Sequence, residues 1–410
     1  MKFVRTFSRI ITGVLFIFSG FVKAVDPLGL TYKLRDYFSA FNLDFLNALA
    51  LPIAIFFITL ELFIGLSLFL NIRVKFTSWL LLIIMSYFTV LTFILAIFNP
   101  VSDCGCFGDA LILTNWQTFW KNVIFFVPTI VIFLQRKEFS PVYKSSTEWI
   151  LSSAFVVIIL AFIFYNYLNL PILDFRPYKT GTNISEKMVI PEGKPVDKYE
   201  FTFIYEKNGE RKEFSLENIP DSTWTWIETK QKLITKGYEP PIHDFSISTL
   251  DGDDITKDVL NDPDYSILIA VYNLDNSNLK AFNRINKLYK ELSDRNCSFY
   301  CLTASTTVSI NNFSKTVKPE YDIYITDEIT LKTMIRSNPG IILLKEGTII
   351  GKWPSGKIPE NMNGDILAYS VTKLHKENSK LLIVAFIAVF FVSVFLFLIG
   401  SDILWRKKQD

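Results

Sequence analysis

Histidine and cysteine are scarce in this chain: two histidines and four cysteines occur among 410 residues. The cysteines lack the paired spacing of a zinc ribbon, and two histidines supply few other ligands, so the sequence argues against a zinc site. The formal net charge is only +2. A dedicated nucleic-acid binder usually has a concentrated basic face, so we expect no nucleic-acid partner.

Several motifs that mark common enzymes are also missing. The sequence has no phosphate-binding Walker loop, no dinucleotide fingerprint, no serine–histidine–aspartate arrangement and no internal repeat. Nucleotide-dependent and hydrolytic chemistry therefore has no support from motifs. Any enzymatic argument depends on one short segment that holds two cysteines.

Apolar residues, in contrast, are abundant: they make up 50% of the chain, which has a mean hydropathy of +0.30. A bilayer core about 30 Å thick requires roughly 20 apolar residues in a helix. Six runs meet this length, which predicts a polytopic helical membrane protein embedded in a lipid bilayer. The first run could instead be a cleavable signal, but no clear small-residue cleavage site follows it. The runs are Phe7–Val25, Leu49–Leu70, Phe76–Phe98, Trp116–Leu134, Trp149–Leu168 and Leu381–Leu404.

Basic residues in the short connecting segments predict the orientation of these spans. They cluster at alternate ends, so both termini are expected in the cytoplasm of a bacterium, although Lys33 and Arg35 oppose this weakly. The periplasmic side of the inner membrane then receives the loops at 26–47 and 99–115 and a large block at 169–379. The clustered residues are Arg5, Arg9, Arg73, Lys75, Arg136, Lys137, Lys144, Arg406, Lys407 and Lys408.

These patterns divide the chain into five parts. A bundle of four membrane helices occupies residues 1–145, and a fifth span occupies 146–170. A periplasmic linker region with a β-hairpin follows over 171–240, then an α/β domain over 241–378. A sixth span and a basic cytoplasmic tail complete the chain over 379–410.

The loop between the third and fourth spans contains the motif Cys104-Gly105-Cys106-Phe107-Gly108. Two thiols one residue apart, with glycines beside them, form a flexible loop whose sulfurs can meet. A disulfide closed over so small a ring is strained and easily reduced, which suits thiol exchange. On spacing alone, a structural cysteine pair or a tight turn with incidental thiols explains the motif equally well.

The segment Phe18–Pro27 resembles the first-helix signature of the DoxX-like proteins. The cysteine loop, followed by Trp116 and Asn122, resembles the methylamine utilisation protein MauE of the same broad superfamily. The resemblance covers about residues 1–140. It implies a four-helix inner-membrane protein linked to disulfide formation or maturation of a periplasmic partner. It also implies that Cys104 and Cys106 are a candidate redox pair, but it implies no methylamine substrate.

Two charged residues in the spans are further candidates. Glu61 lies mid-span, where an ionisable side chain is costly and is by default a functional candidate. The alternative is a protonated or hydrogen-bonded packing residue, with Gly65 one turn away. Lys23 ends the first span, and we favour the interpretation that it snorkels to the headgroups. It could instead lie near Cys104 and Cys106 and favour a thiolate.

The block at 169–379 has short β-branched strands in place of long apolar runs. Strands at Tyr199–Tyr205 and near Lys212–Leu216 flank an Asn-Gly turn, which predicts a hairpin. Asp221–Thr223 then predicts the start of a helix over Trp224–Ile234. From residue 242 strands alternate with helices up to a hairpin at 340–353, which predicts a sheet with helices on its faces.

This order resembles the thioredoxin-like fold over residues 240–360, especially its membrane-anchored periplasmic branch. Ile242–Phe245 with Leu250–Gly252 resembles its first strands. Ser337–Gly340 resembles its cis-proline loop, which implies that Pro339 is cis. In redox-active members a Cys-x-x-Cys pair follows the first core strand. Here that position reads Asn273–Asn278, without cysteine, so the domain lacks that chemistry.

The two remaining cysteines do not replace the missing pair. Cys297 and Cys301 lie four residues apart on a predicted strand, which separates them by about 13 Å, too far for a disulfide. We expect both to be buried packing residues. His243 is expected to be a capping or surface residue.

Three functions fit these patterns. In the first, Cys104 and Cys106 pass disulfide equivalents between a membrane partner, with a quinone as one candidate, and a periplasmic client protein. In the second, the chain is a non-catalytic assembly subunit that binds another membrane subunit and a periplasmic client. The third, a transporter built around Glu61, has the least support because a single acid is its only evidence.

Overall fold

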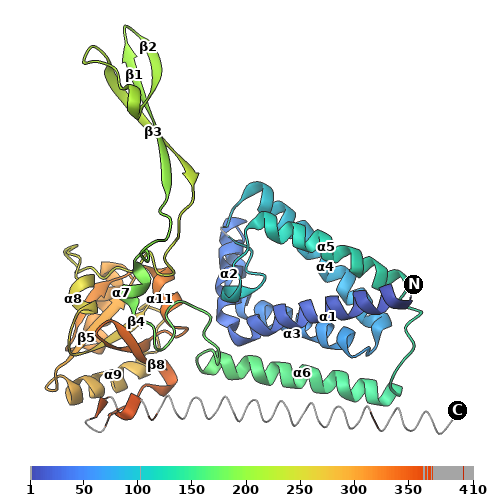
Figure 1. Ribbon diagram of the computed structural model, residues 1–410. Coiled ribbons are helices and arrows are strands. Elements are labelled where there is room, and N and C mark those ends of the chain that lie inside the picture. Colours follow the sequence, from blue (N-terminus) through green and yellow to red (C-terminus); the bar gives the residue numbers. More distant parts are fainter. Residues whose placement is uncertain are drawn as a thin grey trace.

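The computed structural model describes residues 2–101, 103–362, 365–366, 368–370, 372 and 400. The predicted sixth span at 381–404, apart from Gly400, and the basic tail after it lie outside the described residues. Figure 1 shows a helical bundle at one side and an α/β domain at the other, with a small separate sheet that projects from the α/β domain.

Five helices among the described residues are long and apolar enough to cross a membrane. They confirm the first five predicted spans. The fourth of them begins with a capping box, in which Thr114 and Gln117 satisfy each other's backbone N–H groups. These helices are α1 (Lys2–Val25), α3 (Ala50–Phe69), α4 (Val74–Phe98), α5 (Asn115–Leu134) and α6 (Ser145–Leu168).

Helices α1 and α3 pack closely because both present glycine at their contact. A Cβ atom on Gly65 of α3 would lie 2.6 Å from the backbone nitrogen of Ile17. A Cβ atom on Gly20 of α1 would lie 2.7 Å from Cγ of Leu62. Small residues allow membrane helices to approach in this way. The close approach brings the polar residues of the two helices together.

The first predicted outer loop contains a helix, which the sequence analysis missed. Helix α2 (Pro27–Ala40) and the 3₁₀-helix η1 (Asp44–Leu49) lie across the end of the bundle. The Asp26 side chain accepts a hydrogen bond from the Gly29 backbone N–H at 3.0 Å, and Pro27 occupies the first helical turn. The Asp-Pro pair is therefore a helix start.

The α/β domain contains a five-stranded sheet in the order β6-β5-β4-β7-β8. Strands β4, β5 and β6 are parallel, whereas β7 is antiparallel to both β4 and β8. The strands are β4 (Tyr265–Val271), β5 (Cys297–Thr303), β6 (Asp322–Ile325), β7 (Gly340–Lys345) and β8 (Thr348–Pro354), followed by η4 (Ser355–Lys357).

Helices cover both faces of this sheet. One face packs against α9 (Leu279–Leu292) and α10 (Thr307–Val317), and Phe282 and Phe313 meet there with ring centroids 4.7 Å apart. The other face packs against α7, α8 and α11, in a second cluster that includes Tyr178. These three helices are α7 (Ile184–Met188), α8 (Thr256–Leu260) and α11 (Glu328–Met334).

This is the thioredoxin-like fold that the resemblance implies, and the Asn338–Pro339 peptide bond is cis as expected. The expected first strands are different, because residues 242–255 form only isolated bridges. Ser248 bridges to Asp254 and to Ile325. A tight turn with Gly252 at φ +97° follows at once, which leaves no run of residues for a ladder.

The projecting sheet has three strands in the order β2-β1-β3, and its third strand contradicts the predicted helix at Trp224–Ile234. Threonine, isoleucine and tryptophan in this segment favour strands, and it pairs with β1 in place of forming a helix. The Asp221 side chain, expected to cap a helix, accepts a hydrogen bond from Thr223 N in a turn. The elements are β1 (Lys198–Lys207), β2 (Glu210–Ser215), η3 (Leu216–Asn218) and β3 (Thr225–Thr235).

Candidate functional site

The loop between α4 and α5 brings its two thiols together. The sulfur atoms of Cys104 and Cys106 are 2.8 Å apart, and both cysteines are in the thiol form. Gly105 between them has φ +63°, a conformation that glycine adopts readily. Gly108 N donates to Gly105 O at 3.1 Å and closes a turn. A disulfide bond is about 2.05 Å long, so this pair requires little movement to form one.

The two cysteines have different surroundings. Cys104 is 8% exposed and packs in an apolar cluster at the end of the bundle. Its carbonyl accepts a hydrogen bond from Tyr37 Oη at 2.6 Å, and its sulfur lies 3.3 Å from Thr118 Oγ1. Cys106 is only half-buried. As a whole residue, Cys106 is therefore the less buried of the two cysteines.

Charge favours the thiolate on Cys106. A hydrogen bond from Cys104 lowers the pKa of the Cys106 thiol, and Lys121 and Lys23 lower it further, against the opposing effects of burial and of the Glu61 carboxylate. The same hydrogen bond, together with burial, raises the pKa of Cys104. The thiolate is the nucleophilic form of cysteine. The geometry thus gives Cys106 the properties of an attacking thiol and Cys104 those of a resolving thiol.

A buried ion pair lies next to the cysteine loop. Lys23 Nζ is 2.8 Å from Glu61 Oε1 and 2.9 Å from Oε2. Ser19 Oγ lies 2.9 Å from Glu61 Oε2 and 2.9 Å from the backbone oxygen of Cys106. The network therefore connects α1, α3 and the loop.

The favoured interpretation of Lys23 as a snorkelling residue is wrong. Its side chain is 6% exposed and turns inward, because the Glu61 carboxylate on the adjacent helix offers a buried ionic partner. Lys23 lies near the cysteine loop, as the alternative interpretation of this residue predicted. Glu61 is hydrogen-bonded on both oxygens, as its packing alternative requires, and it also lies beside the candidate pair.

Ion pairs hold the loop on either side of the cysteines. Before them, Lys33 Nζ of α2 lies 2.9 Å from Asp103 Oδ2. After them, Arg336 Nη2 lies 2.9 Å from Asp109 Oδ2, and its Nε lies 2.8 Å from Asp26 Oδ2. The sequence analysis missed Arg336, which immediately precedes the cis-proline loop. No sequence signal joined it to a loop more than 200 residues away.

The thioredoxin-like domain places its cysteine-free segment beside the cis-proline loop. Asn338 Nδ2 donates to Asn273 O at 2.7 Å, and Asn278 N donates to Asn338 O at 3.2 Å. Pro339 follows Asn338 directly. Tyr272, just before this segment, has its hydroxyl 3.4 Å from that of Tyr32 in α2. The edge that would hold a redox pair therefore contacts the membrane domain.

Cys297 and Cys301 are buried packing residues, as expected. They are 7% and 0% exposed and belong to the core cluster beneath α9 and α10. Burial raises the pKa of both thiols to about 12. His243 is an exposed surface residue with Nε2 3.0 Å from Asp244 Oδ2, which confirms its expected place.

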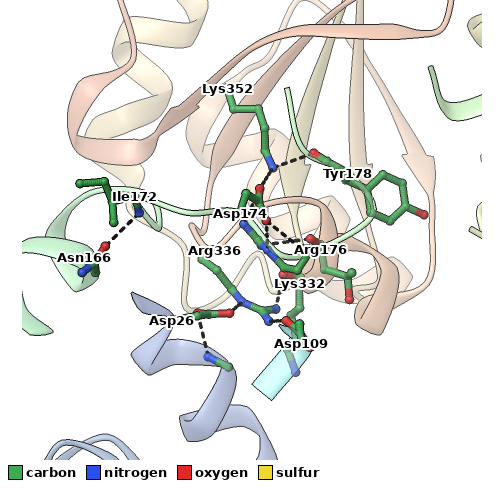
Figure 2. A network of polar contacts seen from close by, with 12 residues as sticks. Asp26, Asp109, Asn166, Ile172, Asp174, Arg176, Tyr178, Lys332, Arg336 and Lys352 are labelled. Atoms are coloured by element: carbon green, nitrogen blue, oxygen red, sulfur yellow. Dashed lines mark hydrogen bonds and ion pairs between the residues drawn. The ribbon is translucent and has the colours of Figure 1, made fainter. Parts of the chain in front are cut away.

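A second cluster of buried charges attaches the chain after α6 to the thioredoxin-like domain (Figure 2). Asp174 accepts from Arg176 Nε at 2.7 Å and from Lys352 Nζ at 2.9 Å. Against the effect of burial, Lys352 and Arg176 lower the pKa of Asp174 to about 2. A cavity of about 300 Å³ lies between this cluster, Arg336 and the cysteine loop. Arg176 and Lys352 share the Asp174 carboxylate, and each also donates to a backbone oxygen, of Thr333 and Tyr178 respectively.

Two family models match parts of the chain. The family model for methylamine utilisation protein MauE matches residues 1–135. A domain of unknown function (DUF8463) matches residues 199–236, which nearly coincide with strands β1 to β3. No curated protein matches the chain.

Two solved structures are similar to part of the chain. StoA from Bacillus subtilis has 19% identity and a TM-score of 0.23, and the match covers 27% of this chain and 87% of StoA. A candidate protein disulfide isomerase from Bacteroides thetaiotaomicron has 16% identity and a TM-score of 0.23, with coverage of 33% and 85%. The family model shows that residues 1–135 are MauE-like, and the strand order of the α/β domain is that of the thioredoxin-like fold.

Proposed function

We propose that this protein exchanges thiols and disulfides at the membrane surface through Cys104 and Cys106. The observation that carries the proposal is the 2.8 Å separation of the two sulfurs on a glycine turn. A merely structural pair would not require a charge arrangement that favours one thiolate. Here the hydrogen bond from Cys104, together with Lys121 and Lys23, favours the thiolate on Cys106 against the opposing effects of burial and of Glu61.

The exchange conserves atoms and electrons without a further reactant. The Cys106 thiolate attacks one sulfur of a client disulfide, and a mixed disulfide forms as the first client thiolate leaves. Cys104 then loses its proton and attacks the Cys106 sulfur, which releases the second client thiolate. Two electrons pass from the cysteine pair to the client, and the reverse sequence oxidises a client dithiol.

We also propose that the exchange takes place on the periplasmic side of a bacterial inner membrane. The alternation of lysine and arginine between the helix ends supports cytoplasmic termini. The cysteine loop, α2 and the thioredoxin-like domain lie at the same end of the bundle (Figure 1), as this orientation requires. An oxidising compartment there would return the pair to its disulfide form after it has oxidised a client dithiol.

Trapping of a mixed disulfide tests the function. In Cys104→Ser the attacking thiol remains but the resolving thiol is lost, so acid-quenched cells should contain Cys106 bonded to a client. The matched variant Cys106→Ser should trap far less, because Cys104 is buried. Both variants should insert and fold normally. A wild-type pair that is uniformly oxidised and resists mild reductant would identify a structural disulfide and reject the function.

A second candidate function, a non-catalytic assembly subunit, is favoured by the exposed edge of the projecting sheet. Strand β3 has eleven residues, all exposed, and among the residues that the structure describes it pairs only with β1, along one side. An unpaired edge can accept an extended segment of another protein as a further strand. We propose a periplasmic client segment as the occupant of this edge.

Site-specific crosslinking separates the two functions. A photoreactive residue at Thr229 in β3 should crosslink to the client in intact cells, whereas one at Lys290 in α9 should not. If the Thr229 crosslink forms but Cys104→Ser traps no mixed disulfide, the assembly function is correct and the redox function is not. An absent crosslink at Thr229 rejects the proposed use of the β3 edge.

A further inference from the structure

The thioredoxin-like domain contributes one buried arginine to the cysteine loop. Arg336 is 8% exposed and lies between Asp26 at the start of α2 and Asp109 in the 3₁₀-helix η2 (Gly108–Ala110), as Figure 2 shows. Its Nη1 also donates to Lys332 O at 2.6 Å, at the end of α11. One guanidinium therefore joins two elements of the membrane domain to the second domain.

Aromatic contacts surround this ion pair. The Arg336 guanidinium lies 5.3 Å from the ring centroid of Tyr32, and Lys332 Nζ lies 4.9 Å from the same ring. Tyr32 and Tyr272 meet edge to face with centroids 6.1 Å apart. Cations over aromatic faces are attracted by the ring quadrupole. The contact between Arg336 and the membrane domain therefore combines ion pairs with oriented cation–aromatic contacts.

Asp109 connects Arg336 to the cysteine loop. It lies three residues after Cys106, and the turn from Gly105 to Gly108 leaves little slack between them. The ring of Phe107 packs on the ring of Phe18 in α1, with ring centroids 5.4 Å apart, and this contact holds the turn against α1. With Lys33 holding Asp103, both ends of the short loop are held by ion pairs.

We propose that Arg336 is a positioning residue for the Cys104–Cys106 pair, supplied in the same chain by a thioredoxin-like domain that has no redox pair of its own. This inference rests on the proposed function. Held at both ends, the loop keeps its sulfurs close enough to form a disulfide. When Arg336 no longer holds Asp109, the loop gains conformations in which the sulfurs separate, so the disulfide form becomes less favourable.

The test measures the disulfide equilibrium of the pair in full-length protein, without a client. Purified protein is equilibrated with defined mixtures of reduced and oxidised glutathione, quenched with acid, alkylated and analysed by peptide mass spectrometry. Arg336→Met should lower the equilibrium constant for disulfide formation by about tenfold, as expected for a lost charge-assisted hydrogen bond. Arg336→Lys should recover part of it.

Two further variants make the result specific. Asp109→Asn removes one of the two ion pairs but leaves Arg336 paired with Asp26, so it should fold and shift the equilibrium in the same direction. Arg284→Met is the matched control, because Arg284 pairs with Glu360 away from the membrane domain and should have no effect. Equilibrium constants of Arg336→Met and Asp109→Asn within about twofold of the wild type would overturn the proposal.

The experiments distinguish failure of the positioning role of Arg336 from failure of the proposed exchange function. A shifted equilibrium without any client trapped in cells would support the positioning role and reject the exchange function. If Cys104→Ser traps a client but Arg336→Met and Asp109→Asn leave the disulfide equilibrium constant unchanged, the exchange function is supported and the role of Arg336 is rejected. A wild-type pair that never exchanges with glutathione would reject both.

Discussion

Lys23 Nζ contacts both carboxylate oxygens of Glu61, at 2.8 and 2.9 Å, and the two side chains are only 6% and 3% exposed. The pair joins the C-terminal end of α1 to the middle of α3, beside the cysteine loop. Burial of two charges is costly, and their mutual attraction offsets this cost only while both are present. The pair therefore contributes more to the geometry of the site than to net stability.

The stability of single and double variants tests this account. Lys23→Met or Glu61→Leu alone leaves one buried charge without its partner, which should cost about 3–5 kcal/mol of unfolding free energy. The double variant should cost less than either single change. Denaturant unfolding in detergent measures these differences. Additive losses in the double variant would show that the two residues do not interact in the folded protein.

The reactivity of Cys106 should depend on pH in a defined direction. Its pKa is lowered, so thiolate accumulates at a lower pH than for an ordinary cysteine. The alkylation rate of Cys106 should rise with pH and level off with a midpoint clearly below about 8.5, the usual thiol pKa. Rapid alkylation with iodoacetamide, followed by peptide mapping, gives this midpoint.

Two substitutions serve as controls for that profile. Lys121→Met removes one of the charges that favour the thiolate, so the midpoint should move to higher pH. Lys290→Met changes a lysine on the far domain and should leave it in place. A wild-type midpoint at or above about 8.5 would contradict the assignment of Cys106 as the attacking thiol.

Periodicity and length predicted the membrane helices and most strands of the α/β domain, because both depend on local patterns of apolar residues. Helix α2, the expected first strands over 242–255 and the segment Trp224–Ile234 were exceptions, and the last of these shows the reason most clearly. Its Asp-Ser-Thr start is compatible with either a helix cap or a turn. Pairing with β1, over 20 residues away, decides the outcome in favour of a strand, and no local pattern reports that contact.

The candidate site was predictable only in part for the same reason. The cysteine motif identifies the loop, and the mid-span position of Glu61 marks it as unusual. The pairing of Glu61 with Lys23 depends on how α1 packs on α3. The contact between Arg336 and Asp109 depends on how two domains dock. Neither arrangement leaves a signal in the spacing of residues along one chain.

The contact between α1 and α3 should not tolerate a larger residue at Gly65. A Cβ atom there would lie 2.6 Å from the backbone nitrogen of Ile17, which cannot move without its helix. Overpacking costs about 1–3 kcal/mol, which exceeds the gain of up to about 1 kcal/mol from replacing glycine by alanine in a helix. Gly65→Ala should therefore destabilise the protein.

Thermal unfolding in detergent measures the effect of Gly65→Ala. Gly356→Ala is the control, since a Cβ atom at that position meets no atom within 4 Å. Equal stability of Gly65→Ala and the wild type would mean that α1 and α3 are further apart than described.

The projecting sheet should be removable without damage to the rest of the protein. The two connecting segments run together at its base, where Tyr238 N donates to Pro195 O at 2.7 Å. Neither core cluster of the thioredoxin-like domain includes a residue from this sheet. Replacement of residues 198–236 by a short glycine–serine linker should change the thermal midpoint by less than about 2 °C, because no buried contact is lost.

The same excised variant separates client binding from thiol chemistry. The glutathione equilibrium of Cys104 and Cys106 should match the wild type, because the sheet contributes none of the contacts described for the cysteine loop. The mixed disulfide trapped by Cys104→Ser should disappear if the sheet delivers the client to the thiols. Persistence of that mixed disulfide in the excised variant would show that the client reaches Cys106 without β3, and the edge strand would then need a different partner.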